Sequence, residues 1–164
     1  MAFLNSFDIS GYGLSAQRYR VNVISSNIAN ANTTRTDEGG PYRRQQVVFK
    51  AVNFEKAYND KLESENNFHK YENPLDEKIG LNQYAKPPIM SVVVDKTVRD
   101  DSKPNMKYDP SHPDANSDGY VAYPNINPVI EMADLIEATK AYQANVSAFQ
   151  SVKTMASSAI QLLS

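Results

Sequence analysis

The chain has 164 residues, 41% of them hydrophobic and 22% charged, which is typical of one or two small folded domains. Its formal net charge is −2, so it lacks the surplus of Lys and Arg that binds phosphates, which argues against a nucleic-acid partner. The absence of Cys rules out disulfides, thiol catalysis and thiolate metal sites. The first residues carry neither a basic leader nor an uninterrupted apolar core, so we expect no cleaved signal peptide.

The first predicted element is an amphipathic helix from Leu4 to about Asn32. The apolar residues Phe7, Leu14, Val21 and Ile28 recur every seven positions, and Gln17, Ile24 and Ala31 lie three residues further on. Such spacing forms a heptad seam along one face of a helix. Gly11 and Gly13 weaken this helix, since each costs about 1 kcal/mol relative to Ala. We therefore expect it to need a partner.

The middle of the chain predicts two strands, Tyr42–Phe49 and Ile89–Val98, because both are rich in β-branched and aromatic residues. They could pair as a small antiparallel sheet. Residues 55–78 between them mix charges of both signs without a sustained period, and predict a loop or poorly ordered insertion. Residues 100–124 hold four Pro and no helical pattern, and predict an extended connector.

The last stretch, Asn127–Ser164, predicts one long helix. Asn127 can cap the first turn, and Pro128 suits the first helical position, where no amide hydrogen is needed. Apolar residues form a narrow stripe at three- and four-residue steps: Met132, Leu135, Ala138, Tyr142, Val146, Phe149, Val152, Ala156, Ala159 and Leu163. A helix of residues 129–164 would extend roughly 54 Å. Most of it must therefore lie against another helix or another subunit.

The side chains off this stripe are small and uncharged, and after Glu137 the only charged residues are Lys140 and Lys153. A helix contacted on several sides needs such a surface, because charges are costly to desolvate. A terminal helix packed only on its own domain is the alternative interpretation.

Together these patterns predict an α+β fold in which the two terminal helices pack as a coiled-coil-like pair around a small antiparallel β-rich insertion. We divide the chain into an N-terminal helix (1–36), a central segment (37–124) and a C-terminal helix (125–164). The seam residues are the predicted assembly contacts: Phe7, Leu14, Val21, Ile24, Ile28, Met132, Leu135, Tyr142, Val146, Phe149, Val152, Ile160 and Leu163.

Candidate chemical sites are weak. Asp114, Asn116, Asp118 and Gly119 imitate the first half of a calcium loop, but the twelfth position is Asn125 rather than Glu, so an Asx-rich turn is favoured. His69 and His112 lack a second ligand at a helical or hairpin spacing. Arg43 and Arg44 are interpreted as the solvated face of the first strand. We find no catalytic motif and predict neither enzymatic activity nor a metal or cofactor.

Three stretches resemble the flagellar basal-body rod family: GLSAQRYRVNVISSNIANANTTRT (13–36), GGPYRRQQVVF (39–49), and the long run from Tyr108 to Met155 that begins YDPSHPDANSDGYVAYPNINPVIEM. They lie at both ends of the chain and at the junctions, outside Lys50–Lys86. The family signature falls on Ser26, Asn27, Ile28, Ala29, Asn30, Gly119, Tyr120, Tyr142, Gln143, Ala144 and Asn145.

The resemblance implies a structural subunit of the proximal rod, the periplasm-spanning drive shaft needed for motility. It also implies export by the flagellar type III apparatus and assembly with copies of itself, with FlgB, FlgF and FlgG, and with FliE and the membrane-ring region. The terminal helices would form the inner tube. Two alternatives remain open: another flagellar axial protein of the distal-rod or hook type, and a soluble helical adaptor.

Overall fold

The computed structural model describes residues 2–53 and 90–162, so the whole of the predicted insertion at 55–78, with His69, and also Leu163 lie outside the described residues. Residues 1–50 and 92–164 form one compact unit, which holds both long helices. The elements follow in the order α1 (Ala2–Ala29), β1 (Gln45–Asn53), β2 (Met90–Arg99), β3 (Asn105–Tyr108), β4 (Tyr120–Tyr123) and α4 (Pro128–Gln161).

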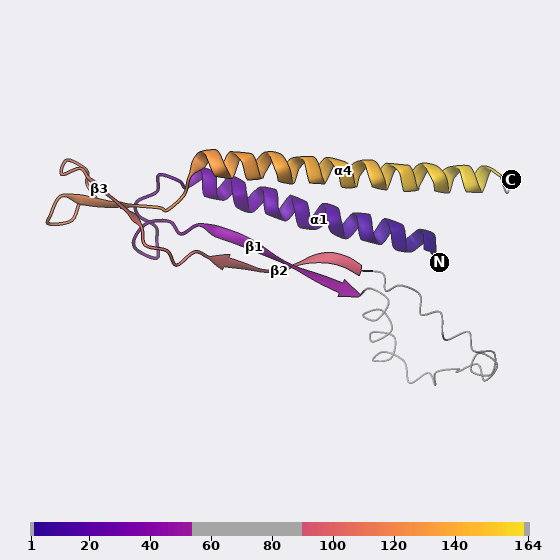
Figure 1. The fold of residues 1–164 in the computed structure, drawn as a ribbon, viewed down its shortest axis with the longest axis horizontal. Helices are drawn as coiled ribbons and strands as arrows, with labels where there is room; N and C mark the ends of the chain where they lie inside the picture. Colours follow the sequence, from indigo (N-terminus) through magenta and orange to yellow (C-terminus); the bar gives the residue numbers. More distant parts are fainter. Residues whose placement is uncertain (1, 54–89, 163–164) are drawn as a thin grey trace, which may run out of the picture. The chain divides into compact units, whose positions relative to one another are not determined.

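Helices α1 and α4 lie side by side and run in opposite directions (Figure 1). Near the chain ends, the rings of Phe7 and Phe149 meet edge to face with their centroids 4.9 Å apart. Closer to the opposite end of the pair, Arg20 Nη1 lies 3.5 Å from Glu137 Oε1. The predicted α+β fold with a pair of terminal helices is therefore confirmed.

The ends of the helices follow the sequence signals. Asn127 caps α4 in an extended conformation, and its Oδ1 accepts the Val129 amide hydrogen at 3.0 Å, with Pro128 next to it in the first turn. At the other junction α1 ends at Ala29, where Asn30 Nδ2 donates to the Ser26 carbonyl at 2.8 Å. No helix in the described ranges is long and apolar enough to cross a membrane.

Strands β1 and β2 pair with each other in opposite directions, as predicted (Figure 1). Within the compact unit this ribbon follows the side of α1 that faces away from α4, and Tyr19 Oη lies 3.0 Å from Thr97 Oγ1. Within the described residues, helix α1 is thus covered on two sides, whereas α4 packs along its length on α1 and meets Arg44, next to β1, in its first turns.

The prediction of an extended connector for residues 100–124 was wrong, because this segment forms a hairpin. Strands β3 and β4 pair antiparallel from Asn105↔Tyr123 to Tyr108↔Tyr120. Asn116 Oδ1 accepts the amide hydrogens of Asp118 and Tyr120 at 3.0 and 2.8 Å, so the acidic stretch is the Asx turn that the sequence favoured. Strands of four residues are too short to leave a period in the sequence.

The hydrophobic core is small, and most of its members have short side chains: Ala16, Val23, Ile24, Ala31, Val121, Ile126, Ala138 and Val152. An antiparallel helix pair with a two-stranded ribbon buries one stripe per helix and leaves the rest in water. Many large apolar side chains consequently stay exposed.

Candidate assembly site

The structure divides the predicted assembly contacts into two groups. Most are buried or half-buried in the packed faces of the two helices: Phe7, Leu14, Val21, Ile24 and Ile28 on α1, and Leu135, Tyr142, Val146, Phe149 and Val152 on α4. Met132 and Ile160 are instead 51% and 68% exposed, so they lie outside this seam. Whether any of these residues contacts another subunit stays a prediction.

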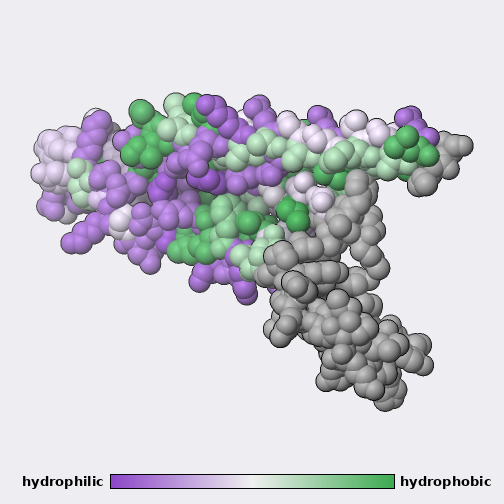
Figure 2. All heavy atoms as spheres, turned by 45° about the vertical axis from the view of Figure 1, so that its right-hand side comes forward, coloured by the Kyte–Doolittle hydropathy of each residue, from purple (hydrophilic) through white to green (hydrophobic). Residues whose placement is uncertain are grey.

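Helix α4 presents large apolar side chains to solvent at both of its ends. The exposed ones are Val129, Ile130, Met132 and Ile136 near the beginning, and Met155, Ile160 and Leu162 near the end. In Figure 2, apolar surface gathers at these two ends of the uppermost helix. Val129, Met132 and Ile136 follow one another at helical steps of three and four residues, so they form one row.

Between these ends several exposed positions of α4 are small, namely Ala144, Ser147, Ala148 and Ser151, and they alternate with polar side chains such as Gln143 and Gln150. Small residues let a second backbone approach closely. The two lysines on this part of the helix, Lys140 and Lys153, are the only charges after Glu137. We call the exposed apolar and small residues of α4 its outer face; a monomeric surface helix would carry more charge there.

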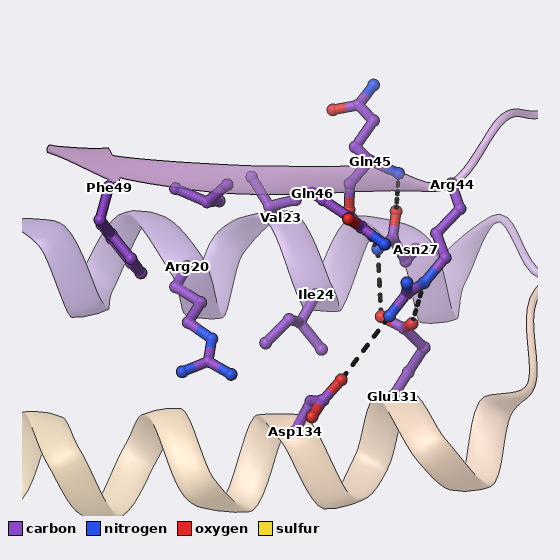
Figure 3. Close-up of a pocket in the computed structure, with 11 residues that line it drawn as sticks. Arg20, Val23, Ile24, Asn27, Arg44, Gln45, Gln46, Phe49, Glu131 and Asp134 are labelled. Atoms are coloured by element: carbon purple, nitrogen blue, oxygen red, sulfur yellow. Dashed lines mark hydrogen bonds and ion pairs between the residues drawn. The ribbon is translucent and has the colours of Figure 1, made fainter. Parts of the chain in front are cut away.

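A buried polar cluster lies where α1, β1 and the first turns of α4 meet (Figure 3). Glu131 is 1% exposed, and its Oε1 accepts from Arg44 Nε at 2.5 Å while its Oε2 accepts from Asn27 Nδ2 at 3.0 Å. Arg44 also reaches Asp134, with 3.6 Å between Nη2 and Oδ2. We call Asn27, Arg44 and Glu131 the junction cluster.

Asn27 attaches the first strand to the first helix. Its amide group donates to the Gln45 carbonyl at 2.8 Å and accepts the Gln45 amide hydrogen at 2.9 Å, as a neighbouring strand would. Tyr42 Oη donates to the same Oδ1 at 3.2 Å. The side chain of Asn27 therefore joins α1, β1 and α4 at one point.

The interpretation of Arg44 as a solvated side chain was wrong. It is 24% exposed and pairs with a carboxylate that is distant in sequence, whereas Arg43 is 63% exposed and pairs with Asp101. Alternation along a strand predicts that neighbours point to opposite sides. Only the fold shows that the buried Glu131 lies on the side to which Arg44 points.

The signature residues of the resemblance fall in three places. Ser26, Asn27 and Asn30 lie at the junction, where Ser26 Oγ is 3.3 Å from Tyr42 Oη. Ile28 is half-buried in the same turn and Ala29 is exposed. Gly119 and Tyr120 form the hairpin, in which Gly119 has φ +80°.

On α4, the signature residues Tyr142 and Asn145 are half-buried, while Gln143 and Ala144 are exposed. A Cβ added to Gly13 would lie 3.1 Å from Asn145 Oδ1. The two helices therefore approach closely at this point. Gly13, which the sequence presented only as a weakness of α1, gives the room for it.

The titratable groups at the surface serve structure. Arg99 holds the pKa of Glu38 below its usual range through a two-pronged ion pair, with 2.5 Å from Nη1 to Oε2 and 3.1 Å from Nη2 to Oε1. The hydroxyl of Ser111 donates to Asp109 at 2.7 Å and lowers the pKa of that carboxyl.

Within residues 2–53 and 90–162, no three His, Asp or Glu side chains converge as metal ligands would. A cavity of about 380 Å³ beside the junction cluster is lined by Arg20, Arg44, Glu131 and Asp134, among others (Figure 3). These charges already pair with acids or bases of the same chain. The cavity therefore offers no uncommitted charge to a ligand.

In the described residues, the long antiparallel terminal helices, the small β ribbon and the outer face of α4, which carries few charges, are typical of a structural subunit. Residues 7–35 match the family profile "Flagella basal body rod protein", and residues 117–162 match "Flagellar basal body rod FlgEFG protein C-terminal".

Relatives that match almost the whole chain are named as flagellar rod proteins as well. The chain is 38% identical to the flagellar basal-body rod protein FlgC of Borreliella burgdorferi and 36% identical to that of Bacillus subtilis, with 99% of each chain covered. It is 33% identical to FlgC of Salmonella typhimurium over 94% of this chain and 93% of that protein.

The chain belongs to the flagellar basal-body rod protein family. The prediction of a structural subunit of the proximal rod is thereby confirmed. These relatives are named as proteins of the flagellar basal-body rod.

Proposed function

We propose that the chain polymerises with copies of itself and with the rod proteins FlgB, FlgF and FlgG, and that it meets FliE and the membrane-ring region at one end. The assembled rod crosses the periplasm, and the chain reaches it through the flagellar type III apparatus. In this role the chain binds no cofactor and has no catalytic activity.

The exposed outer face of α4 is the observation that carries this proposal. Val129, Met132 and Ile136 form an apolar row that no part of residues 2–53 or 90–162 covers, and Leu162 is 88% exposed. Burying a side chain of this size is worth roughly 1.5–3 kcal/mol. Contact with neighbouring subunits would recover that free energy.

A subunit that closes a tube must offer two different surfaces, because each copy contacts one neighbour on either side. Helix α4 has an exposed apolar face, and Ile9 on α1 is 39% exposed and could contribute to a second one. The seam residues between the helices would then hold the two surfaces in a fixed relation. They contribute to assembly by ordering the subunit.

The decisive test is Met132→Asp in a motile strain whose own copy of the gene is deleted. Met132 is 51% exposed, so a carboxylate there stays hydrated in the free chain and becomes desolvated only in the assembly. We expect the variant to be exported but absent from purified basal bodies, with no swimming on soft agar. Met132→Leu, which keeps the apolar volume, is the matched control and should swim.

Normal swimming with Met132→Asp would contradict contact through this face. A second measurement separates the assembly from a soluble adaptor. The dilute purified chain should show much less helix by circular dichroism than the 28 residues of α1 and the 34 of α4 would give. High helicity with a sharp, concentration-independent melt would favour the adaptor.

A further inference from the structure

The junction cluster uses every hydrogen-bonding position of Asn27. Its two amide hydrogens go to the Gln45 carbonyl and to Glu131, and its oxygen accepts from the Gln45 amide and from Tyr42. Asn27 is only 1% exposed, so water cannot replace a lost partner. All four hydrogen bonds of the Asn27 side chain can therefore form only when its neighbours are arranged in this one way.

The apolar seam is far less selective. Leu135, Tyr142 and Phe149 are seven residues apart on α4, and all three are large and half-buried. A slide of α4 along α1 by seven residues, about 10 Å, would bring one of them to the place of another. The heptad pattern of α1 repeats in the same way, so apolar residues would still meet apolar residues.

The same slide would destroy the junction cluster. The residue seven positions after Glu131 is Ala138, and the position seven before it is Pro124, which precedes the helix. Neither can accept a hydrogen bond from the Asn27 side chain or pair with Arg44. A slipped register would therefore leave a buried amide and a half-buried guanidinium without their acceptor.

We propose that the junction cluster specifies the register of α1 on α4 and attaches β1 to that register, while the seam supplies affinity without register. Buried polar groups specify register in coiled coils in the same way, at some cost in stability. The inference goes beyond the assembly role and does not depend on it, because it concerns contacts within one chain.

Register matters for the ends of the subunit. With Asn27 beside Glu131 and Phe7 beside Phe149, the last turns of α4 extend past the beginning of α1 (Figure 1). Ile160 and Leu162 lie on that extension. A slip of one heptad would lengthen or shorten it by about 10 Å and displace every surface that a neighbour could contact.

Because the chain has no Cys, two engineered Cys can report the register of the helices without competing disulfides. Gly13→Cys with Asn145→Cys probes the observed register, in which these residues touch. Gly13→Cys with Val152→Cys probes a slip of one heptad. The effective concentration of each pair is measured in a glutathione redox buffer on the chain that carries the two Cys, mixed with an excess of the Cys-free chain at a total concentration at which circular dichroism shows both helices formed. We expect the first to exceed the second by about tenfold or more, since the cluster contains charge-assisted hydrogen bonds.

Both pairs are then placed in a chain that also carries Asn27→Leu, Arg44→Met and Glu131→Leu. These changes keep similar volumes and leave no buried charge unpaired, so the helices should still pair. We expect the preference to fall to less than about half of its original value. Asn22→Leu, at an exposed position of α1, is the control and should leave it unchanged.

A preference that stays within about twofold in the triple variant would overturn the proposal, because the seam alone would then specify register. The proposal would also be overturned if the Cys pairs showed no preference for the observed register in a chain whose junction cluster is intact. The circular dichroism spectrum of each chain distinguishes loss of register from loss of helix.

Discussion

Two glycines in α1 have opposite surroundings, and replacing each with Ala tests how the helices pack. A Cβ at Gly11 meets nothing within 4 Å, whereas one at Gly13 meets Asn145 side-chain atoms at 3.1–3.2 Å. Ala is favoured over Gly inside a helix by about 0.8–1.0 kcal/mol. Gly11→Ala should gain this amount in full, which is about a fivefold shift in the equilibrium between helix and coil.

Gly13→Ala should gain little or nothing. Asn145 must leave its rotamer or move by a few tenths of an ångström, and an off-rotamer side chain costs about 0.5–1.5 kcal/mol. That cost offsets the propensity gain. Truncating the neighbour with Asn145→Ala removes the contact, so Gly13→Ala should become stabilising in that background.

The assay is the circular dichroism signal of the purified chain at 222 nm, followed against temperature for the four single and double variants. Their double-mutant cycle gives the coupling between the two positions. If Gly13→Ala raised helicity as much as Gly11→Ala in the unmodified chain, Asn145 would not lie against Gly13. The register of α1 on α4 described above would then be incorrect in solution.

Three further outcomes are expected. Gly119→Ala should destabilise the β3–β4 hairpin and speed its amide hydrogen exchange, because Gly119 has φ +80° and a Cβ there would lie 2.8 Å from a ring carbon of Tyr108. Arg99 lowers the pKa of the Glu38 carboxyl in the folded chain, so this ion pair stabilises the fold above the ordinary pKa of Glu, and that stability is lost as the pH falls through the lowered pKa. Carboxyl NMR titration should show the pKa of Glu38 returning to its ordinary value in Arg99→Gln and at high salt. Phe149→Asp places a carboxylate in the helix seam at a cost of several kcal/mol, so it should abolish incorporation into basal bodies. A strain that carries the control Phe149→Leu should swim. A motile Phe149→Asp strain would show that the seam is not needed for assembly.

Local patterns in the sequence determined the helices and their ends. Asn127 and Pro128 predicted the start of α4 correctly, because capping depends on neighbours two or three residues away. The seven-residue spacing of Phe7 and Leu14 predicted a paired helix, since periodicity places these residues on one face. The antiparallel pair and the β1–β2 ribbon followed from the same kind of evidence.

The sequence also carried the family resemblance, which the full-length relatives confirm. It did not predict the β3–β4 hairpin, because two strands of four residues show no period and the prolines around Pro110 indicate only a break in helix. Nor did it separate Met132, which is exposed, from Leu135, which is half-buried, since a narrow stripe does not say where the partner helix lies.

Only the tertiary structure decided what the polar residues do. Asn27 and Glu131 are 104 positions apart, and Arg44 and Glu131 are 87 apart, so no local pattern connects them. The sequence places Glu131 in the first turn of the helix and Glu137 six residues later, but it does not show that the first is buried in the junction cluster and the second exposed. The apolar period determined that two helices would pair, because hydrophobic contact is not directional. The hydrogen bonds of the cluster are directional, and they exist only where the folded chain brings three distant segments to the same point.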